Sequence, residues 1–298
     1  MSWLFFSILS PAVYAIVNFV DKYILSKQIR DYRGMSMFAS IMALLFGSAF
    51  WIFSGFPLMN RNDSLLVILS GVLTLWAQAV YFKALSSEQT SKVIILFQMG
   101  PVITLVLSFL FLKELITLKQ FIGFLIILAS TIGASIKKED LKLSINSSFF
   151  LILANQIMWS IGAVLFKFVV DANSFVKVVA YESWGIALGG LSLFTFSAAI
   201  RNAFLKTLRT LKKSALGFVF LNEGVFVIGR LLAFLAISLG PLYLVSVLAS
   251  TQVFFGVLYG LILTIFWPKV FQEDTSSKGI IKRISLAILT FIGVALVY

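Results

Sequence analysis

The sequence is dominated by apolar runs of about 20 residues that recur along the whole chain, separated by short polar breaks. A run of that length spans the hydrocarbon core of a bilayer as an α-helix, and a helix satisfies its own backbone hydrogen bonds in lipid. Of the 298 residues 60% are apolar and 12% are charged, whereas soluble domains have about 45–50% and 25%. The chain is therefore predicted to be an integral membrane protein throughout.

Counting the runs between polar breaks gives ten segments, and each is expected to form one transmembrane helix. The first run lacks the basic start and the small-residue cleavage site of a signal peptide, so it is predicted to remain as the first helix. The expected fold class is all-α integral membrane. The segments cover residues 2–26, 34–56, 63–85, 88–112, 118–136, 147–170, 175–199, 213–238, 240–266 and 280–298.

The polar break KKEDLKLSIN divides the chain nearly in half, and the two halves align weakly with each other. A shift of 145 residues aligns PAVYAIVNFVDK with QIMWSIGAVLFK, and a shift of 152 aligns FKALSSEQ with FLAISLGP. Five helices per half is an odd number, so the second copy must enter the membrane in the opposite sense. The prediction is a 5+5 inverted repeat around a central cavity. Residues 1–136 would form the first unit, 137–146 the linker and 147–298 the second unit.

The stretch between about residues 80 and 135 carries three recognisable patterns. They are an aromatic-x-Ala-Leu pattern that begins at Phe82, a Gln-x-x-Pro pattern that begins at Gln98, and an acidic helix end at Glu114. With these patterns the chain resembles the EamA-type branch of the drug/metabolite transporter superfamily. The resemblance implies a basket of ten helices with a central substrate cavity, used for export or exchange of small metabolites or amino acids. It implies an architectural role for Glu114.

Positive charges are distributed unequally between the two sides that ten spans would define. Loops after odd-numbered runs carry fifteen lysines and arginines, against four on the side of both termini. Because positive residues are retained in the cytoplasm, this bias predicts that both termini face outward in the cytoplasmic membrane. The family resemblance implies the opposite orientation, which stays open. The fifteen are Lys27, Arg30, Arg33, Lys137, Lys138, Lys142, Arg201, Lys206, Arg209, Lys212, Lys213, Lys269, Lys278, Lys282 and Arg283; the four are Arg61, Lys113, Lys119 and Lys177.

Two charged residues interrupt the apolar run 213–238. Charged side chains at membrane depth are costly and commonly face a cavity or a partner, so they are functional candidates. Glu223 and Arg230 are seven residues apart, which places them on the same face of a helix about 10 Å apart along its axis. A zwitterionic solute could bridge them. The alternative is that each pairs with another helix and holds the bundle together.

Further candidates lie in other predicted helices. Tyr14, Asn18 and Asp21 form one stripe near the end of the first helix, with Lys22 adjacent. Asp21 and Lys22 could bind substrate or reach to the membrane interface. Glu182 is the second candidate carboxylate for substrate or coupling-ion binding.

Other polar, aromatic and small residues suggest either pocket lining or packing. Trp159 and Gln98 could line a pocket, although isolated aromatic residues more often serve packing. Glycines in two predicted helices are expected to allow close helix packing. They are Gly185, Gly189, Gly190, Gly256 and Gly260.

The composition also limits the function. The chain has no histidine and no cysteine, which removes thiol nucleophiles, imidazole bases and the usual zinc ligands. We therefore expect no enzyme, no cofactor and no bound metal, and the scattered positive charge favours lipid headgroups over nucleic acid as a partner.

The predicted function is secondary active transport, most simply export of small metabolites or amino acids by alternating access, with protons as a candidate coupling ion. The alternatives are an exchanger of anionic phosphorylated metabolites or nucleotide sugars, a lipid-handling membrane protein, and a structural subunit. The expected partners are a small-molecule substrate and the lipid bilayer, with the protein acting as a monomer or homodimer.

Overall fold

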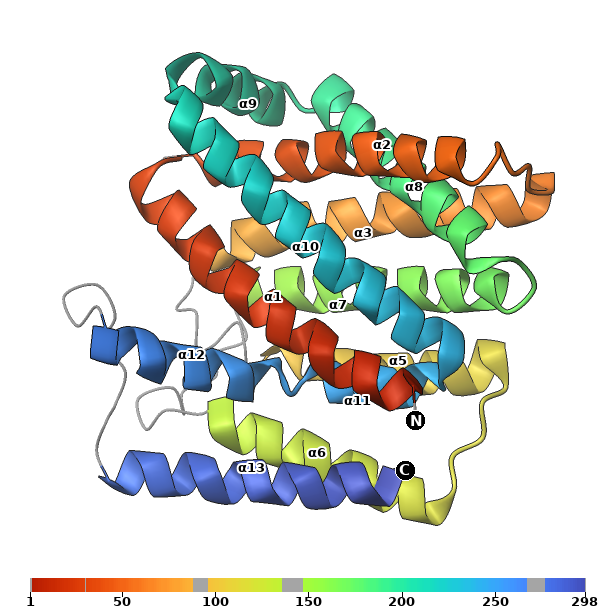
Figure 1. Ribbon diagram of the computed structural model, residues 1–298, viewed down its shortest axis with the longest axis vertical. Coiled ribbons are helices and arrows are strands. Elements are labelled where there is room, and N and C mark those ends of the chain that lie inside the picture. The colour runs from red at the N-terminus through yellow and green to blue at the C-terminus, as the bar shows by residue number, and fades with distance from the viewer. Residues whose placement is uncertain (1, 30, 88–95, 136–146, 267–276, 298) are drawn as a thin grey trace.

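The computed structural model describes residues 2–29, 31–87, 96–135, 147–266 and 277–297, and in these ranges all regular structure is helical (Figure 1). Most of the described residues belong to α-helices. The elements are α1 (Ser2–Lys27), η1 (Tyr32–Gly34), α2 (Met35–Phe53), α3 (Arg61–Ser87), α5 (Met99–Leu107), η2 (Ser108–Leu112), α6 (Leu118–Ser135), α7 (Ser147–Val170), α8 (Phe175–Phe196), α9 (Ala198–Thr210), α10 (Lys213–Leu239), α11 (Leu242–Ala249), α12 (Gln252–Phe266) and α13 (Ser277–Val297).

The described helices confirm a multi-pass membrane protein. Six of them are long and apolar enough to cross a membrane, or up to seven if the bent pair of α8 and α9 forms one span. Three shorter apolar stretches, Met99–Leu112, Leu118–Ala134 and Ile284–Val297, have 10–17 residues. Each of the ten expected runs coincides with helix in its described part. Ten membrane crossings and a 5+5 repeat stay predictions.

Two of the expected runs are not single continuous helices. The seventh run was expected to continue to residue 199, but α8 ends at Phe196 and the chain bends by 103° into α9. The bend occurs at Ser197, whose backbone is extended and whose hydroxyl accepts a hydrogen bond from the Ile200 N–H. A serine in this conformation caps the new helix. The ninth run is likewise interrupted, between Ala249 and Gln252.

The strongest packing in the fold joins helices from opposite halves of the chain. Helix α3 packs against α7 and α8, α2 packs against α8, α1 packs against α10, and α6 packs against α13. Figure 1 shows α1 and α10 running side by side across the stack that α2, α3 and α7 form. Both chain ends lie close together at one end of the bundle (Figure 1). The two halves therefore share one interior.

Glycines allow the backbones of α3 and α8 to cross in direct contact. A Cβ atom on Gly185 would collide with the Ile68 carbonyl oxygen, and one on Gly71 would collide with the Glu182 carbonyl oxygen. A Cβ atom on Gly189 would lie 3.2 Å from the Cβ atom of Leu75. The expected close packing at Gly185 and Gly189 is confirmed. This crossing fixes the height of Glu182 within the bundle.

Of the other predicted packing glycines, Gly190 lies in a close helix contact and Gly256 does not. A Cβ atom on Gly190 would collide with Ser40, so this residue also lies in a tight helix contact. The prediction is wrong for Gly256, because a Cβ atom there would meet nothing within 4 Å. Helix α12 therefore does not use this glycine for close packing within the described structure.

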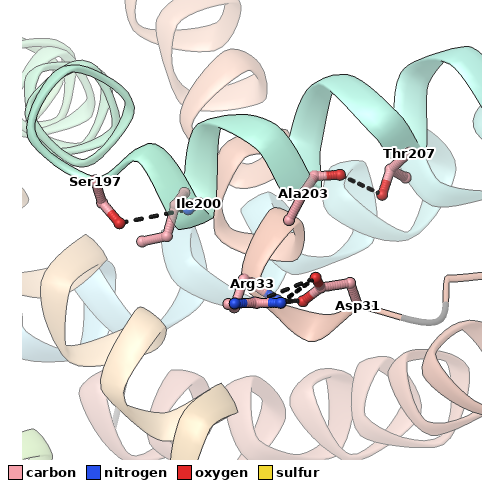
Figure 2. A network of polar contacts seen from close by, with 6 residues as sticks. All are labelled: Asp31, Arg33, Ser197, Ile200, Ala203 and Thr207. Atoms are coloured by element: carbon pink, nitrogen blue, oxygen red, sulfur yellow. Dashed lines mark hydrogen bonds and ion pairs between the residues drawn. The ribbon is translucent and has the colours of Figure 1, made fainter.

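The connection between α1 and α2 is held by a local ion pair and a close contact with α9 (Figure 2). Asp31 accepts a hydrogen bond from the Arg33 backbone N–H at 3.1 Å and pairs with its guanidinium at 2.7 Å. The hydrogen bond from the Arg33 side chain lowers the pKa of the Asp31 carboxyl below its usual value. Gly34 then lies against α9, where a Cβ atom would be 3.1 Å from the Cα atom of Phe204.

The α3–α8 crossing yields a stability prediction. Gly185→Leu places a large side chain against the Ile68 carbonyl and should lower the free energy of unfolding by about 1–3 kcal/mol, the usual range for overpacking. Thermal unfolding of the purified protein in detergent measures the loss. Gly217→Ala is the matched control, because a Cβ atom at Gly217 meets nothing within 4 Å. An unchanged melting temperature for Gly185→Leu would contradict the close crossing.

Candidate functional site

Glu223 and Arg230 of α10 lie in the interior of the bundle and are almost fully buried. Glu223 is 5% exposed and Arg230 is 4% exposed. Helix α10 is 27 residues long, begins after Lys212 and ends at Gly240 before Pro241, so both charges lie well away from its ends. Their burial inside a membrane helix bundle requires partners or a cavity.

Arg230 has its partner on α8. Its Nη1 atom lies 3.6 Å from Oε2 of Glu182, and its Nη2 atom donates a hydrogen bond of 2.9 Å to the Ser183 hydroxyl. The guanidinium also lies over the ring of Phe234, with Cζ 5.8 Å from the ring centroid. This distance and position allow a cation–π contact. Glu182 and Arg230 therefore form a buried ion pair that joins α8 to α10.

The ion pair is electrostatic rather than a tight hydrogen-bonded clamp. A separation of 3.6 Å exceeds the range of a hydrogen bond between nitrogen and oxygen. In the described part of the chain, neither carboxylate oxygen of Glu182 nor Nε of Arg230 has a hydrogen-bond partner. The attraction is nevertheless strong, because both side chains are removed from water. If either side chain moved away, the other charge would stay buried in an apolar environment without a counter-charge.

Glu223 and Arg230 line one small cavity between α2, α3, α8 and α10. Its volume is about 10 Å³, roughly the space for one water molecule. Two neutral polar residues of α3, Thr74 and Gln78, contribute to the wall. The remaining wall is apolar and consists of Ala39, Ala43, Leu75, Ile186, Phe226 and Val227. The surrounding helices thus close tightly around the two charges.

The stripe predicted on α1 is divided between two environments. Asp21 faces α10, where it accepts a hydrogen bond of 2.7 Å from the Asn222 side chain. Tyr14 also faces α10, with its ring 5.4 Å from that of Phe226. Asn18 is exposed. Lys22 belongs to α1, but its side chain lies outside the described structure.

Gln98 and Trp159 lie apart from the cavity that contains Glu223. Gln98 is buried and accepts a hydrogen bond of 3.0 Å from Thr131 of α6. Trp159 of α7 packs against Phe97, with the two ring centroids 6.2 Å apart. Neither residue contributes to the cavity wall. The structure therefore does not gather all the sequence candidates into one site.

Several residues of the site were not found by sequence reasoning. Ser183 binds Arg230, Asn222 binds Asp21, and Thr74 lines the cavity. Asn222 directly precedes Glu223, so a polar pair at membrane depth was a usable signal. No spacing in the sequence connects α8 with α10, and the pairing of Glu182 with Arg230 required the tertiary structure.

Glu114 forms a contact between the two halves of the chain. Its Oε1 atom accepts a hydrogen bond of 3.0 Å from the backbone N–H of Leu242, the first residue of α11. The first N–H groups of a helix have no partner within that helix, and a carboxylate near them is favourable. Glu114 therefore caps α11, in agreement with the architectural role that the resemblance implied.

Comparison with known proteins identifies the first half of the chain. Residues 1–136 match the sequence profile described as the EamA-like transporter family. The chain is similar to that family over these residues. The family consists of membrane transporters, and the buried charges of α10 lie in the second half, outside the matched residues.

Two further similarities agree with this assignment. A solved crystal structure, described only as that of a protein, covers 99% of this chain and 94% of its own, with a TM-score of 0.69 and 15% identity. It shows that the chain shares its fold with a solved structure over nearly its whole length. The uncharacterized protein MJ1333.1 of Methanocaldococcus jannaschii is 42% identical over 69 residues, 23% of this chain. The chain spans 50% of the length of that relative.

The buried ion pair yields a stability prediction. Arg230→Met leaves Glu182 buried without its counter-charge and should lower the free energy of unfolding by about 3–5 kcal/mol. The double variant Arg230→Met with Glu182→Gln should lose less than Arg230→Met alone, because no charge remains unpaired. Thermal unfolding of the wild type, Arg230→Met, Glu182→Gln and the double variant gives the coupling energy. Losses that simply add would show that the two side chains do not interact.

Proposed function

We propose that this protein is a secondary transporter that moves small metabolites or amino acids out of the cell by alternating access. The single observation that carries the proposal is the placement of Glu223, a buried carboxylate on the wall of a cavity in the centre of an EamA-like bundle. A carboxylate in that position can bind a cationic group of a solute or a proton. The coupling ion we propose is the proton.

The packing of the helices supports ten spans in two inverted copies. The internal alignment pairs residues 11–22 of α1 with residues 156–167 of α7, and the end of α3 with that of α10. Exchanging the equivalent helices converts the α1–α10 contact into the α7–α3 contact, and both are extensive. The α2–α8 and α6–α13 contacts map onto themselves. A two-fold relation between residues 1–136 and 147–298 accounts for this pattern, with 137–146 as the linker.

The ion pair at Arg230 bears on the choice among substrates. Exchange of phosphorylated metabolites or nucleotide sugars requires a cation that is available to an anionic group. Arg230 is already neutralised by Glu182 at 3.6 Å, whereas Glu223 has no such counter-charge among the described residues. Lys167 does not alter this preference, because it pairs with Asp171. The Lys22 side chain lies outside the described structure and does not enter this comparison. We therefore favour solutes that carry an amino group.

The transport proposal is tested with purified protein in lipid vesicles. Vesicles loaded with a mixture of labelled amino acids and small amines should release solute when a pH gradient is applied across the membrane. Glu223→Gln should abolish the response to the gradient while the protein remains folded, because the amide cannot exchange a proton. Asp171→Asn, a change at an exposed carboxylate, should transport like the wild type. Wild-type rates in Glu223→Gln would refute a role for this residue.

The orientation remains a proposal that rests on the charge bias. Helix α9, which carries several basic residues and packs against η1, lies at the end of the bundle opposite to the beginning of α1 and the end of α13 (Figure 1). Under the positive-inside rule that end is cytoplasmic, and both termini face outward. A C-terminal fusion to a reporter that is active only in the cytoplasm should stay inactive in cells. Strong reporter activity would reverse the orientation.

A further inference from the structure

We infer that the cavity between α2, α3, α8 and α10 selects solutes with a net positive charge and that the cation and a proton compete for Glu223. The inference rests on the proposed function, because it names the substrate class of the same site. It narrows the choice from amino acids in general to amines and other organic cations.

The charges of the described residues around the cavity do not balance. Arg230 is the positive residue on the wall, and Glu182 offsets its charge. Glu223 remains, and Asp21 lies behind it on α1 within electrostatic range. The Asn222 amide that binds Asp21 is neutral and leaves its charge uncompensated. The excess charge at the site is therefore negative, which favours a cation and repels an anion.

Glu223 is the group that would hold the cation. It is 5% exposed and lines the cavity, and within the described chain no hydrogen bond or ion pair to its carboxylate is found. A bare carboxylate in such a place is too costly to persist, so it must bind a proton or a cation. These two occupants exclude each other, because each neutralises the same charge. Exchange of a cation for a proton follows from this competition.

The rest of the wall matches the chemistry of an amine. Thr74 and Gln78 offer neutral oxygen atoms that can accept hydrogen bonds from an ammonium group. The ring of Phe226 also lines the cavity, and an aromatic face attracts a cation. The same wall offers a carboxylate group no uncompensated cation. A solute larger than water can enter only when the helices around the cavity separate, as alternating access requires.

The competition has a defined dependence on pH. The titratable or charged groups near Glu223 are Tyr14 and Asp21 on α1, Glu182 on α8 and Arg230 on α10, with Tyr81 of α3 close to Asp21. Helix α2 contributes none. A proton must leave Glu223 before a cation binds, so cation affinity should rise with pH. The rise is at most about tenfold per pH unit for one competing proton.

A matched series of ligands tests the charge preference directly. Alanine, leucine and phenylalanine are each used in three forms: the amide, which is a cation, the free amino acid, which is a zwitterion, and the N-acetyl acid, which is an anion. The melting temperature of the purified protein in detergent reports binding, since a ligand of the folded state raises it. At least one amide should raise it more than its zwitterionic and anionic counterparts, and more strongly at pH 6.5 than at pH 5, because an α-amino group with a pKa of about 7.7–8.0 stays mostly protonated over that range.

Variants identify the residue responsible. Glu223→Gln should remove both the shift caused by the amide and its dependence on pH, while Glu223→Asp, which keeps the charge, should retain part of each. Asp171→Asn should respond like the wild type. A larger shift with zwitterions or anions, or no shift with any amide at tens of millimolar, would overturn the inference. A response to amides that is unchanged in Glu223→Gln would also overturn it.

The binding assay and the vesicle assay distinguish a failure of the cation site from a failure of the proposed transport function. If amides bind through Glu223 but no solute crosses the vesicle membrane, the cation site stands and the proposed transport function fails. If the vesicles transport zwitterions or anions and no amide binds, the transport function stands and the inference fails. Proton release from the unbuffered protein upon addition of an amide gives a third readout, and its absence at pH 7 in a protein that binds the amide would refute the competition.

Discussion

The burial of charge in an apolar bundle is the constraint on which the arrangement of this protein depends. Arg230 cannot remain ionised in the centre of α10 without a counter-charge, and Glu182 of α8 provides it. The pair fixes α8 and α10 relative to each other at the level of the cavity. The pair also determines the charge of the site. Because Glu182 neutralises Arg230, Glu223 is the cavity-lining charge that has no ion-pair partner among the described residues.

The position of Glu182 depends in turn on glycine. Helices α3 and α8 cross where Gly71 and Gly185 bring their backbones into contact, and a side chain at either position would collide with a carbonyl oxygen. Glu182 lies one turn before Gly185 on α8, so the crossing sets its height. In lipid, where apolar association provides little driving force between helices, such close packing contributes much of the stability. The geometry of the site thus follows from small residues that are themselves without function in binding.

The intimate packing of the two halves explains why the site lies at their interface. The cavity has α2 and α3 of the first half on one side and α8 and α10 of the second on the other. Glu114 provides a further link, since it belongs to the first half and caps α11 of the second. A relative movement of the halves would open the cavity at one end or the other. This is the arrangement that alternating access needs, and it follows from cross-half packing rather than from a separate domain.

The sequence by itself determined the class of the protein, most helix positions and the identity of the buried charges. Apolar runs of sufficient length can form only helices in lipid, and Glu223, Arg230 and Glu182 stand out because ionised groups are rare there. The tertiary structure alone decided that Arg230 pairs with Glu182, and that Gln98 and Trp159 lie apart from the cavity. Helical periodicity shows which residues share a face of one helix, but not which neighbouring helix that face meets. The bend at Ser197 was missed for a related reason, because a single serine carries no signal strong enough to end an otherwise helical run.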